Sequence, residues 1–139
     1  MITVTRYHDI SCGHRVVGHE GKCRNLHGHN YRFYFTIASD KGLDDVGRVL
    51  DFSVIKERLC MWLEEVLDHK MIMWSEDPML PEVKKIDPTV VEVPFNPTAE
   101  NLAKYMVEVS AHLLKGTGTK LIKVTIEETR KCSATYETT

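Results

Sequence analysis

Alternating apolar and polar residues predict two strands in the first part of the chain. The first covers residues 2–17, where one parity carries Ile2, Val4, Ile10, Cys12, His14 and Val16. Arg6 and His8 interrupt that face. The second covers residues 29–39, and its apolar parity carries Tyr31, Phe33, Phe35 and Ile37. His27 and His29 share this parity, so two imidazoles continue the face that is expected to be buried.

Two later stretches have the period of an amphipathic helix. A helix over about residues 53–67 can be capped by Asp51 or Ser53, and its core positions are Ile55, Leu59, Trp62, Leu63 and Val66. A second helix follows Asn96-Pro97, takes Thr98 as its N-cap and ends at Gly116. Its core positions are Leu102, Met106, Val109 and Leu113.

Between these helices, several charges and three prolines predict an irregular excursion over residues 75–89. A short strand over residues 90–93 follows, and two final strands cover about residues 120–128 and 132–137. Strand pairs at both ends exclude a simple βαβ unit. The expected fold class is α+β, an antiparallel four-stranded sheet with two helices on one face. Without an internal repeat or a linker, residues 1–139 are expected to form a single domain.

Charge and hydropathy narrow the functional classes. A net charge of −2 gives no support for a nucleic-acid platform or a polybasic membrane surface. The chain has no run of 18 apolar residues and no signal-peptide core at its N-terminus, which favours a cytoplasmic protein. Its four cysteines form no CxxC pair and are expected to be thiols.

The stretch His27-Gly28-His29 is the strongest chemical signal. Side chains at i and i+2 of a strand share one face, and His14 could join them from the preceding strand. Three neutral imidazoles with an open fourth position are typical of a catalytic zinc site. Cys12 or Cys23 as a fourth ligand would instead close the site and make the zinc structural.

Cys23 lies in a polar segment between Lys22 and Arg24, which favour a thiolate that can act as a base or nucleophile. It could equally be a small buried residue. Asp68-His69 ends the first predicted helix. The pair could be a proton relay, or a histidine placed at a helix C-terminus by the helix dipole.

Glu128 has the parity of Ile122, Val124 and Ile126, which places a carboxylate on a buried face. Such a carboxylate needs partners. A buried Arg or Lys is one interpretation, and a ligand edge with two N–H donors is the other.

Together these positions resemble the 6-pyruvoyl-tetrahydropterin synthase superfamily, and most closely its 6-carboxy-tetrahydropterin synthase branch, over nearly the whole chain. The resemblance lies in Gly13-His14-Arg15, Cys23-x-x-x-His27-Gly28-His29, Val49-Leu50-Asp51-Phe52, Leu67-Asp68-His69, Asn96-Pro97-Thr98-Ala99-Glu100-Asn101, and Glu128-Thr129 followed by Ala134-x-Tyr136. The three-residue gap between Cys23 and His27 is similar to the carboxy-forming branch.

The resemblance implies a role for each matched residue. His14, His27 and His29 match the ligands of a Zn²⁺ cofactor, and Cys23 matches the catalytic cysteine. Asp68 and His69 match a second catalytic pair, and Glu128 matches the glutamate that holds the pterin. The fold implied is the tunnelling fold, with two trimers stacked as a homohexamer and active sites between subunits.

The activity implied is zinc-dependent conversion of 7,8-dihydroneopterin triphosphate to 6-carboxy-5,6,7,8-tetrahydropterin. This lyase reaction releases acetaldehyde and triphosphate and belongs to 7-deazaguanine and queuosine biosynthesis. Lys22, Arg24 or Arg15 could neutralise the triphosphate. Two alternatives stay open: a 6-pyruvoyl-tetrahydropterin synthase, which eliminates triphosphate without carbon–carbon cleavage, and a non-catalytic zinc-stabilised pterin-binding module.

Overall fold

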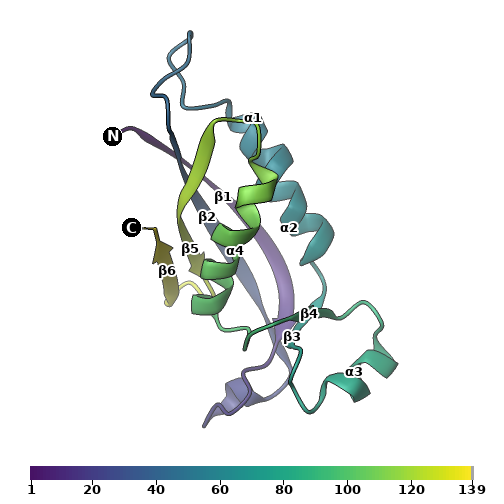
Figure 1. Ribbon diagram of the computed structural model, residues 1–139. Helices are drawn as coiled ribbons and strands as arrows, with labels where there is room; N and C mark the ends of the chain where they lie inside the picture. The colour runs from purple at the N-terminus through teal and green to yellow at the C-terminus, as the bar shows by residue number, and fades with distance from the viewer. Residues whose placement is uncertain (139) are drawn as a thin grey trace.

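The computed structural model describes residues 1–138, which form a mixed sheet covered on one face by helices (Figure 1). The sheet has six strands in the order β4-β3-β1-β2-β5-β6. Their bounds are β1 Thr3–His14, β2 His27–Ser39, β3 Met71–Trp74, β4 Val91–Val93, β5 Thr119–Glu127 and β6 Ser133–Glu137. The α+β class is confirmed, and the expected strand pairs at the two ends of the chain form the antiparallel part of the sheet.

The expectation of a purely antiparallel sheet of four strands is wrong. The sheet has six strands, and the two at one edge are parallel. β3 pairs with β1 in parallel, and β4 pairs with β3 in parallel. β3 was not expected, and β4 is the short strand expected over residues 90–93. Both strands are short, and neither is long enough to show a clear alternation of its own.

The first covering helix runs without a break through α1 Phe52–Ile55, a π-helical segment Lys56–Cys60 and α2 Met61–Val66. The second is α4 Ala99–Leu113. Their predicted caps are confirmed, because Asp51 accepts a hydrogen bond from the Ser53 backbone N–H and Thr98 accepts one from that of Asn101. A third helix, α3 Leu80–Ile86, occupies part of the expected irregular excursion. None of the helices described is long and apolar enough to cross a membrane.

The core lies between the sheet and its two long helices (Figure 1). The apolar stripe of β2 is fully buried, as its alternation predicts, and it packs among Ile10, Ile55, Leu59, Leu63, Leu102 and Met106. Arg6 and His8 interrupt the same face of β1 because they reach the first helix. Arg6 donates to the Phe52 carbonyl, and His8 Nε2 lies 2.8 Å from Glu64 Oε1.

Pairing of β1 with β2 brings together the residues expected to do chemistry. His14 pairs directly with His27, and Cys12 pairs with His29. Gly13 and Gly28 stand opposite each other between these pairs. A Cβ at Gly28 would lie 3.1 Å from the Cys12 carbonyl oxygen, so a glycine allows the two backbones to approach closely here.

Candidate metal centre and active site

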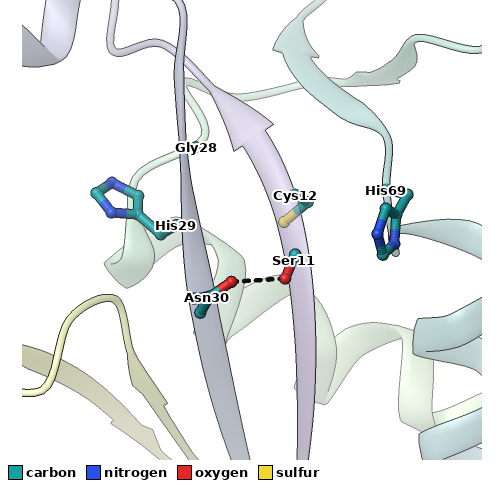
Figure 2. Close-up of a pocket in the computed structure, with 6 residues that line it drawn as sticks. All are labelled: Ser11, Cys12, Gly28, His29, Asn30 and His69. Carbon is teal, nitrogen blue, oxygen red and sulfur yellow. Dashed lines mark hydrogen bonds between the residues drawn. The ribbon is translucent and has the colours of Figure 1, made fainter.

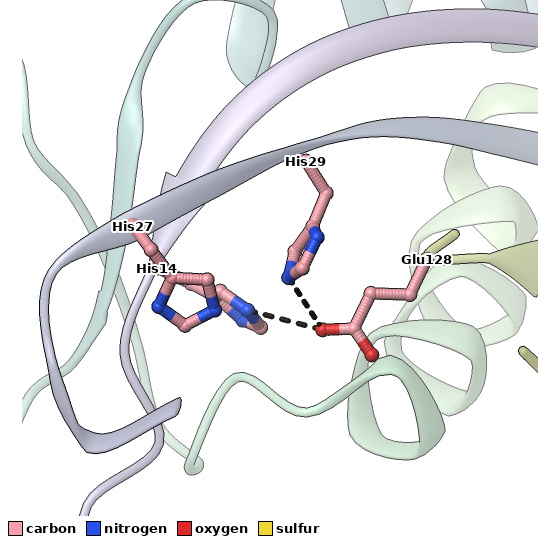
Figure 3. A group of neighbouring side chains, drawn as sticks. All are labelled: His14, His27, His29 and Glu128. Atoms are coloured by element: carbon pink, nitrogen blue, oxygen red, sulfur yellow. Dashed lines mark ion pairs between the residues drawn. The ribbon is translucent and has the colours of Figure 1, made fainter. Parts of the chain in front are cut away.

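Three histidine side chains from the paired ends of β1 and β2 converge beside Glu128, as Figure 3 shows. One ligand atom from each of His14, His27, His29 and Glu128 lies within 4.8 Å of the others. The ring centroids of the histidines are 4.6–5.1 Å apart. Their Nε2 atoms are buried and form no regular hydrogen bond within residues 1–138, although those of His14 and His29 lie close to the Glu128 carboxylate. The predicted convergence of the three histidines is therefore what the structure shows.

The second ring nitrogen of two of these histidines is held by the backbone. His14 Nδ1 lies 2.7 Å from the Pro97 carbonyl oxygen, and His27 Nδ1 lies 2.7 Å from that of Asn25. A carbonyl oxygen only accepts, so both Nδ1 atoms carry a proton, and each ring in its neutral form then has a free lone pair on Nε2. Imidazoles oriented in this way, with their Nε2 atoms turned to one point, fit Zn²⁺.

The loop before α4 fixes this orientation. Asn96 accepts from the Val17 backbone N–H and donates to the Val17 carbonyl, at 3.0 and 2.8 Å. Asn101 in α4 donates to the Asn96 carbonyl at 2.9 Å. The loop is thereby bound to the chain just after β1, with Pro97 against His14. These contacts give the Asn96-Pro97-Thr98 motif a physical role beside the histidines.

Glu128 follows β5 and points its carboxylate into the histidine cluster (Figure 3). Its Oε1 lies 3.1 Å from His14 Nε2 and 2.9 Å from His29 Nε2. The contact with His14 lowers the pKa of Glu128 below its ordinary value, against the opposing effect of burial. Burial lowers the pKa of His29, which favours the neutral form that binds metal. A carboxylate here can complete a tetrahedral metal site or turn toward a bound molecule.

The closeness of Glu128 to the histidines was not foreseen from the sequence. Its expected parity with Val124 and Ile126 is correct, but Ile122 does not share their face. Leu121 is buried in its place, because the register of β5 with β2 shifts between Thr36 and Ile37. Only the register of β2 with β5 sets the distance from Glu128 to the histidines, and one sequence does not reveal that register.

Neither candidate cysteine belongs to the group of possible metal ligands found within residues 1–138. Burial and the charge of Asp68 raise the pKa of Cys12 to about 12, so Cys12 is a neutral thiol and a poor ligand. Cys23 lies half-buried in a short 3₁₀ turn, Lys22–Arg24. Its carbonyl accepts a hydrogen bond from the Val16 backbone N–H at 2.8 Å. This bond ties the turn to the segment that directly follows His14.

Arg15 has a structural partner instead of a free charge for phosphate. Its Nε donates to Asp77 Oδ2 at 2.7 Å, and its Nη1 donates to the Arg24 carbonyl at 2.9 Å. The Asp77 side chain is fully buried. The guanidinium therefore joins the end of β1, the turn that carries Cys23 and the segment before α3. Of the three cations considered for the triphosphate, Lys22 and Arg24 are exposed.

Asp68 and His69 are brought together, as expected for a relay. Asp68 Oδ2 lies 2.8 Å from His69 Nδ1, and its Oδ1 accepts from the Ser11 backbone N–H at 2.9 Å. Burial opposes ionisation of Asp68, but these hydrogen bonds outweigh it and lower the pKa of the carboxyl. His69 has φ 61°, a left-handed conformation that is uncommon outside glycine and typical of functional positions.

The Asp68-His69 pair does not join the histidine cluster of its own chain. The side chain of His69 is 80% exposed. Figure 2 shows the ring of His29 beyond β2 and the ring of His69 beyond β1, with the two strands between them. An open cavity of about 370 Å³ runs along this surface, lined by Ser11, Cys12, Gly28, His29, Asn30 and His69.

Comparison with known proteins identifies the family of this chain. The family model described as 6-pyruvoyl tetrahydropterin synthase matches residues 3–139. A 6-carboxy-5,6,7,8-tetrahydropterin synthase of Rickettsia felis is 33% identical over 95% of this chain and 97% of its own. A relative of the same name from Aquifex aeolicus is 37% identical over 84% of this chain and 76% of its own.

Solved structures show the same fold. An uncharacterized protein from Wolinella succinogenes superposes with a TM-score of 0.86 at 24% identity, over 98% of this chain and 97% of its own. The 6-pyruvoyl tetrahydropterin synthase of Caenorhabditis elegans gives 0.72 at 27% identity, over 99% and 96%. The sheet and its covering helices are those of the tunnelling fold, and the chain belongs to the 6-pyruvoyl tetrahydropterin synthase family.

Proposed function

We propose that this protein is a zinc-dependent carbon–carbon lyase that converts 7,8-dihydroneopterin triphosphate to 6-carboxy-5,6,7,8-tetrahydropterin, acetaldehyde and triphosphate. The observation that carries the proposal is the convergence of three buried Nε2 atoms that form no regular hydrogen bond, beside a carboxylate that can turn away to leave an open position on a catalytic zinc. The carboxy-forming product is supported by the name shared by the relatives from Rickettsia and Aquifex. Such an activity would serve 7-deazaguanine and queuosine synthesis in the cytoplasm.

The roles follow from the chemistry of the side chains. Zinc held by His14, His27 and His29 supplies a Lewis acid for the oxygens of the pterin side chain. The Cys23 thiolate removes a side-chain proton, and His69, oriented by Asp68, exchanges the complementary proton. Glu128 accepts two hydrogen bonds from the amino-pyrimidine edge and so fixes the pterin. The exposed Lys22 and Arg24 are the cations available to the triphosphate.

One variant distinguishes the two possible roles of Glu128, which are binding the pterin and binding the metal. If Glu128 anchors the pterin, Glu128→Gln should raise the KM by about 10- to 100-fold, because a charge-assisted pair of hydrogen bonds is lost. Zinc content and the free energy of unfolding should stay unchanged. The matched control is Glu127→Gln, the next residue, whose carboxylate accepts from Tyr34 instead of facing the histidines.

Loss of zinc from Glu128→Gln would make Glu128 a metal ligand, and unchanged kcat and KM would make it a structural partner only. Either result removes the pterin-anchoring role.

We further propose that each site is completed by Asp68 and His69 of a neighbouring subunit in a homohexamer of two stacked trimers. This proposal is supported by the outward position of His69 and its separation from the cluster of its own chain (Figure 2). Mixed oligomers of Cys23→Ala and His69→Ala chains are then expected to regain activity, although each variant alone is inactive. Random mixing places an intact Cys23 beside an intact His69 in roughly a quarter of the sites.

The measurement is turnover after the two variants are dissociated and reassembled, with native mass spectrometry to count mixed oligomers. Reassembled wild-type protein is the control for recovery. Mixed oligomers without activity would contradict a site shared between subunits, because a shared site would be intact in roughly a quarter of their positions.

A pyruvoyl-forming synthase is the second candidate function. It is favoured by the match to the Caenorhabditis elegans 6-pyruvoyl tetrahydropterin synthase over nearly the whole chain. The same residues would eliminate triphosphate without breaking a carbon–carbon bond. Acetaldehyde among the products separates the two, because only the carboxy-forming reaction releases it.

A further inference from the structure

Tyr31 has a buried hydroxyl that forms no hydrogen bond within residues 1–138. Its side chain is 0% exposed, and the hydroxyl has no hydrogen-bond partner within residues 1–138. A buried polar group without a partner destabilises a protein, and tyrosine hydroxyls normally find one. The unpaired hydroxyl therefore calls for a partner that the protein itself does not supply.

The position of Tyr31 links this hydroxyl to the metal centre. Tyr31 follows His29 on the same face of β2, and its ring meets those of His14 and His29 edge-on, with centroids 5.9 and 5.4 Å away. Phe33 and Phe35 continue the same stripe away from the histidines. Phenylalanine thus satisfies the packing along this stripe, and a hydroxyl occurs only at its end beside the histidines.

The chemistry of a phenol suits it to donate here. A tyrosine hydroxyl carries its own proton and can donate one hydrogen bond. The Tyr31 ring lies edge-on to the rings of His14 and His29, so its hydroxyl belongs to the surroundings of the metal centre. A donor held in place there can stabilise an atom that becomes negative.

We propose that the Tyr31 hydroxyl donates a hydrogen bond to the side-chain oxygen of the bound pterin at which negative charge develops after Cys23 removes a proton. The proton stays on Tyr31, and no covalent step is involved. The inference rests on the proposed function and adds a substrate-contacting donor to it. Because the bond strengthens as charge develops, it lowers the barrier more than it tightens substrate binding.

The test is Tyr31→Phe, which removes one oxygen and keeps the ring. The expected result is a fall in kcat of about 10- to 100-fold with a smaller change in KM. Zinc content should be unchanged, and the urea midpoint of the substrate-free protein should be equal or higher, because a buried unpaired hydroxyl is lost. The matched control is Tyr34→Phe, whose hydroxyl donates to Glu127 on the opposite face of the same strand, and whose kcat should be that of the wild type.

Three results would overturn the inference, and they are distinguishable. Wild-type kcat in Tyr31→Phe with an active parent protein removes the donor role alone. A lower urea midpoint or lost zinc in Tyr31→Phe makes the hydroxyl a structural group. A wild-type protein that leaves the pterin triphosphate unchanged removes the proposed function and this inference with it.

Discussion

Replacing Cys23 with alanine is expected to abolish turnover and to leave zinc bound. Cys23 is absent from the metal-ligand cluster, so the three histidines keep their geometry without it. Loss of the group that removes the side-chain proton should lower kcat by about 1,000-fold. Turnover and metal content, measured on the same preparation, test both halves of the expectation.

The matched control is Cys132→Ala, which removes an exposed thiol and should leave kcat and zinc content unchanged. Cys23→Ser, with a similar size and a far weaker base, should be nearly as inactive as the alanine variant. Zinc loss on substitution of Cys23 would make it a ligand, in agreement with the structural-zinc module. Retained turnover would remove it as the base.

Replacing His29 with alanine is expected to remove both zinc and activity. The change leaves two imidazoles where three converge, and it keeps the hydrogen bonds that orient His14 and His27. Loss of a partner that only orients a metal ligand typically costs 10- to 100-fold in affinity or activity, so loss of the ligand itself should cost more than about 100-fold. Zinc affinity by competition with a chelator is the measurement.

His112→Ala is the control for this loss, because His112 is exposed near the end of α4, away from the cluster. It should bind zinc and turn over as the wild type does. A His29→Ala protein that still binds zinc tightly would contradict a centre built on three histidines.

The hairpin and the helices of this fold follow from periodicity, because each presents one long apolar stripe. The convergence of His14, His27 and His29 follows in the same way, since parity within a strand and antiparallel pairing fix which side chains meet. The helix α3 forms within the expected irregular excursion because Pro81 lies in its first turn, where a missing N–H costs nothing.

The remaining features depend on contacts between distant segments. The parallel strands β3 and β4 have only four and three residues, and β3 pairs with the edge of β1 while β4 pairs with β3. The place of His69 relative to the histidine cluster depends on which side of β1 its segment passes. The alternation of β2 predicts that Tyr31 is buried, but it does not predict whether its hydroxyl finds a hydrogen-bond partner. That depends on the three-dimensional positions of all its neighbours.

Incubation of the zinc-loaded protein with 7,8-dihydroneopterin triphosphate, followed by mass analysis of the products, tests the central claim most directly. The account predicts 6-carboxy-5,6,7,8-tetrahydropterin, acetaldehyde and triphosphate in equal amounts, and no products from Cys23→Ala. A 6-pyruvoyl product without acetaldehyde would contradict the carboxy-forming assignment. Unchanged substrate would contradict the claim that this histidine cluster is the metal centre of a pterin side-chain lyase.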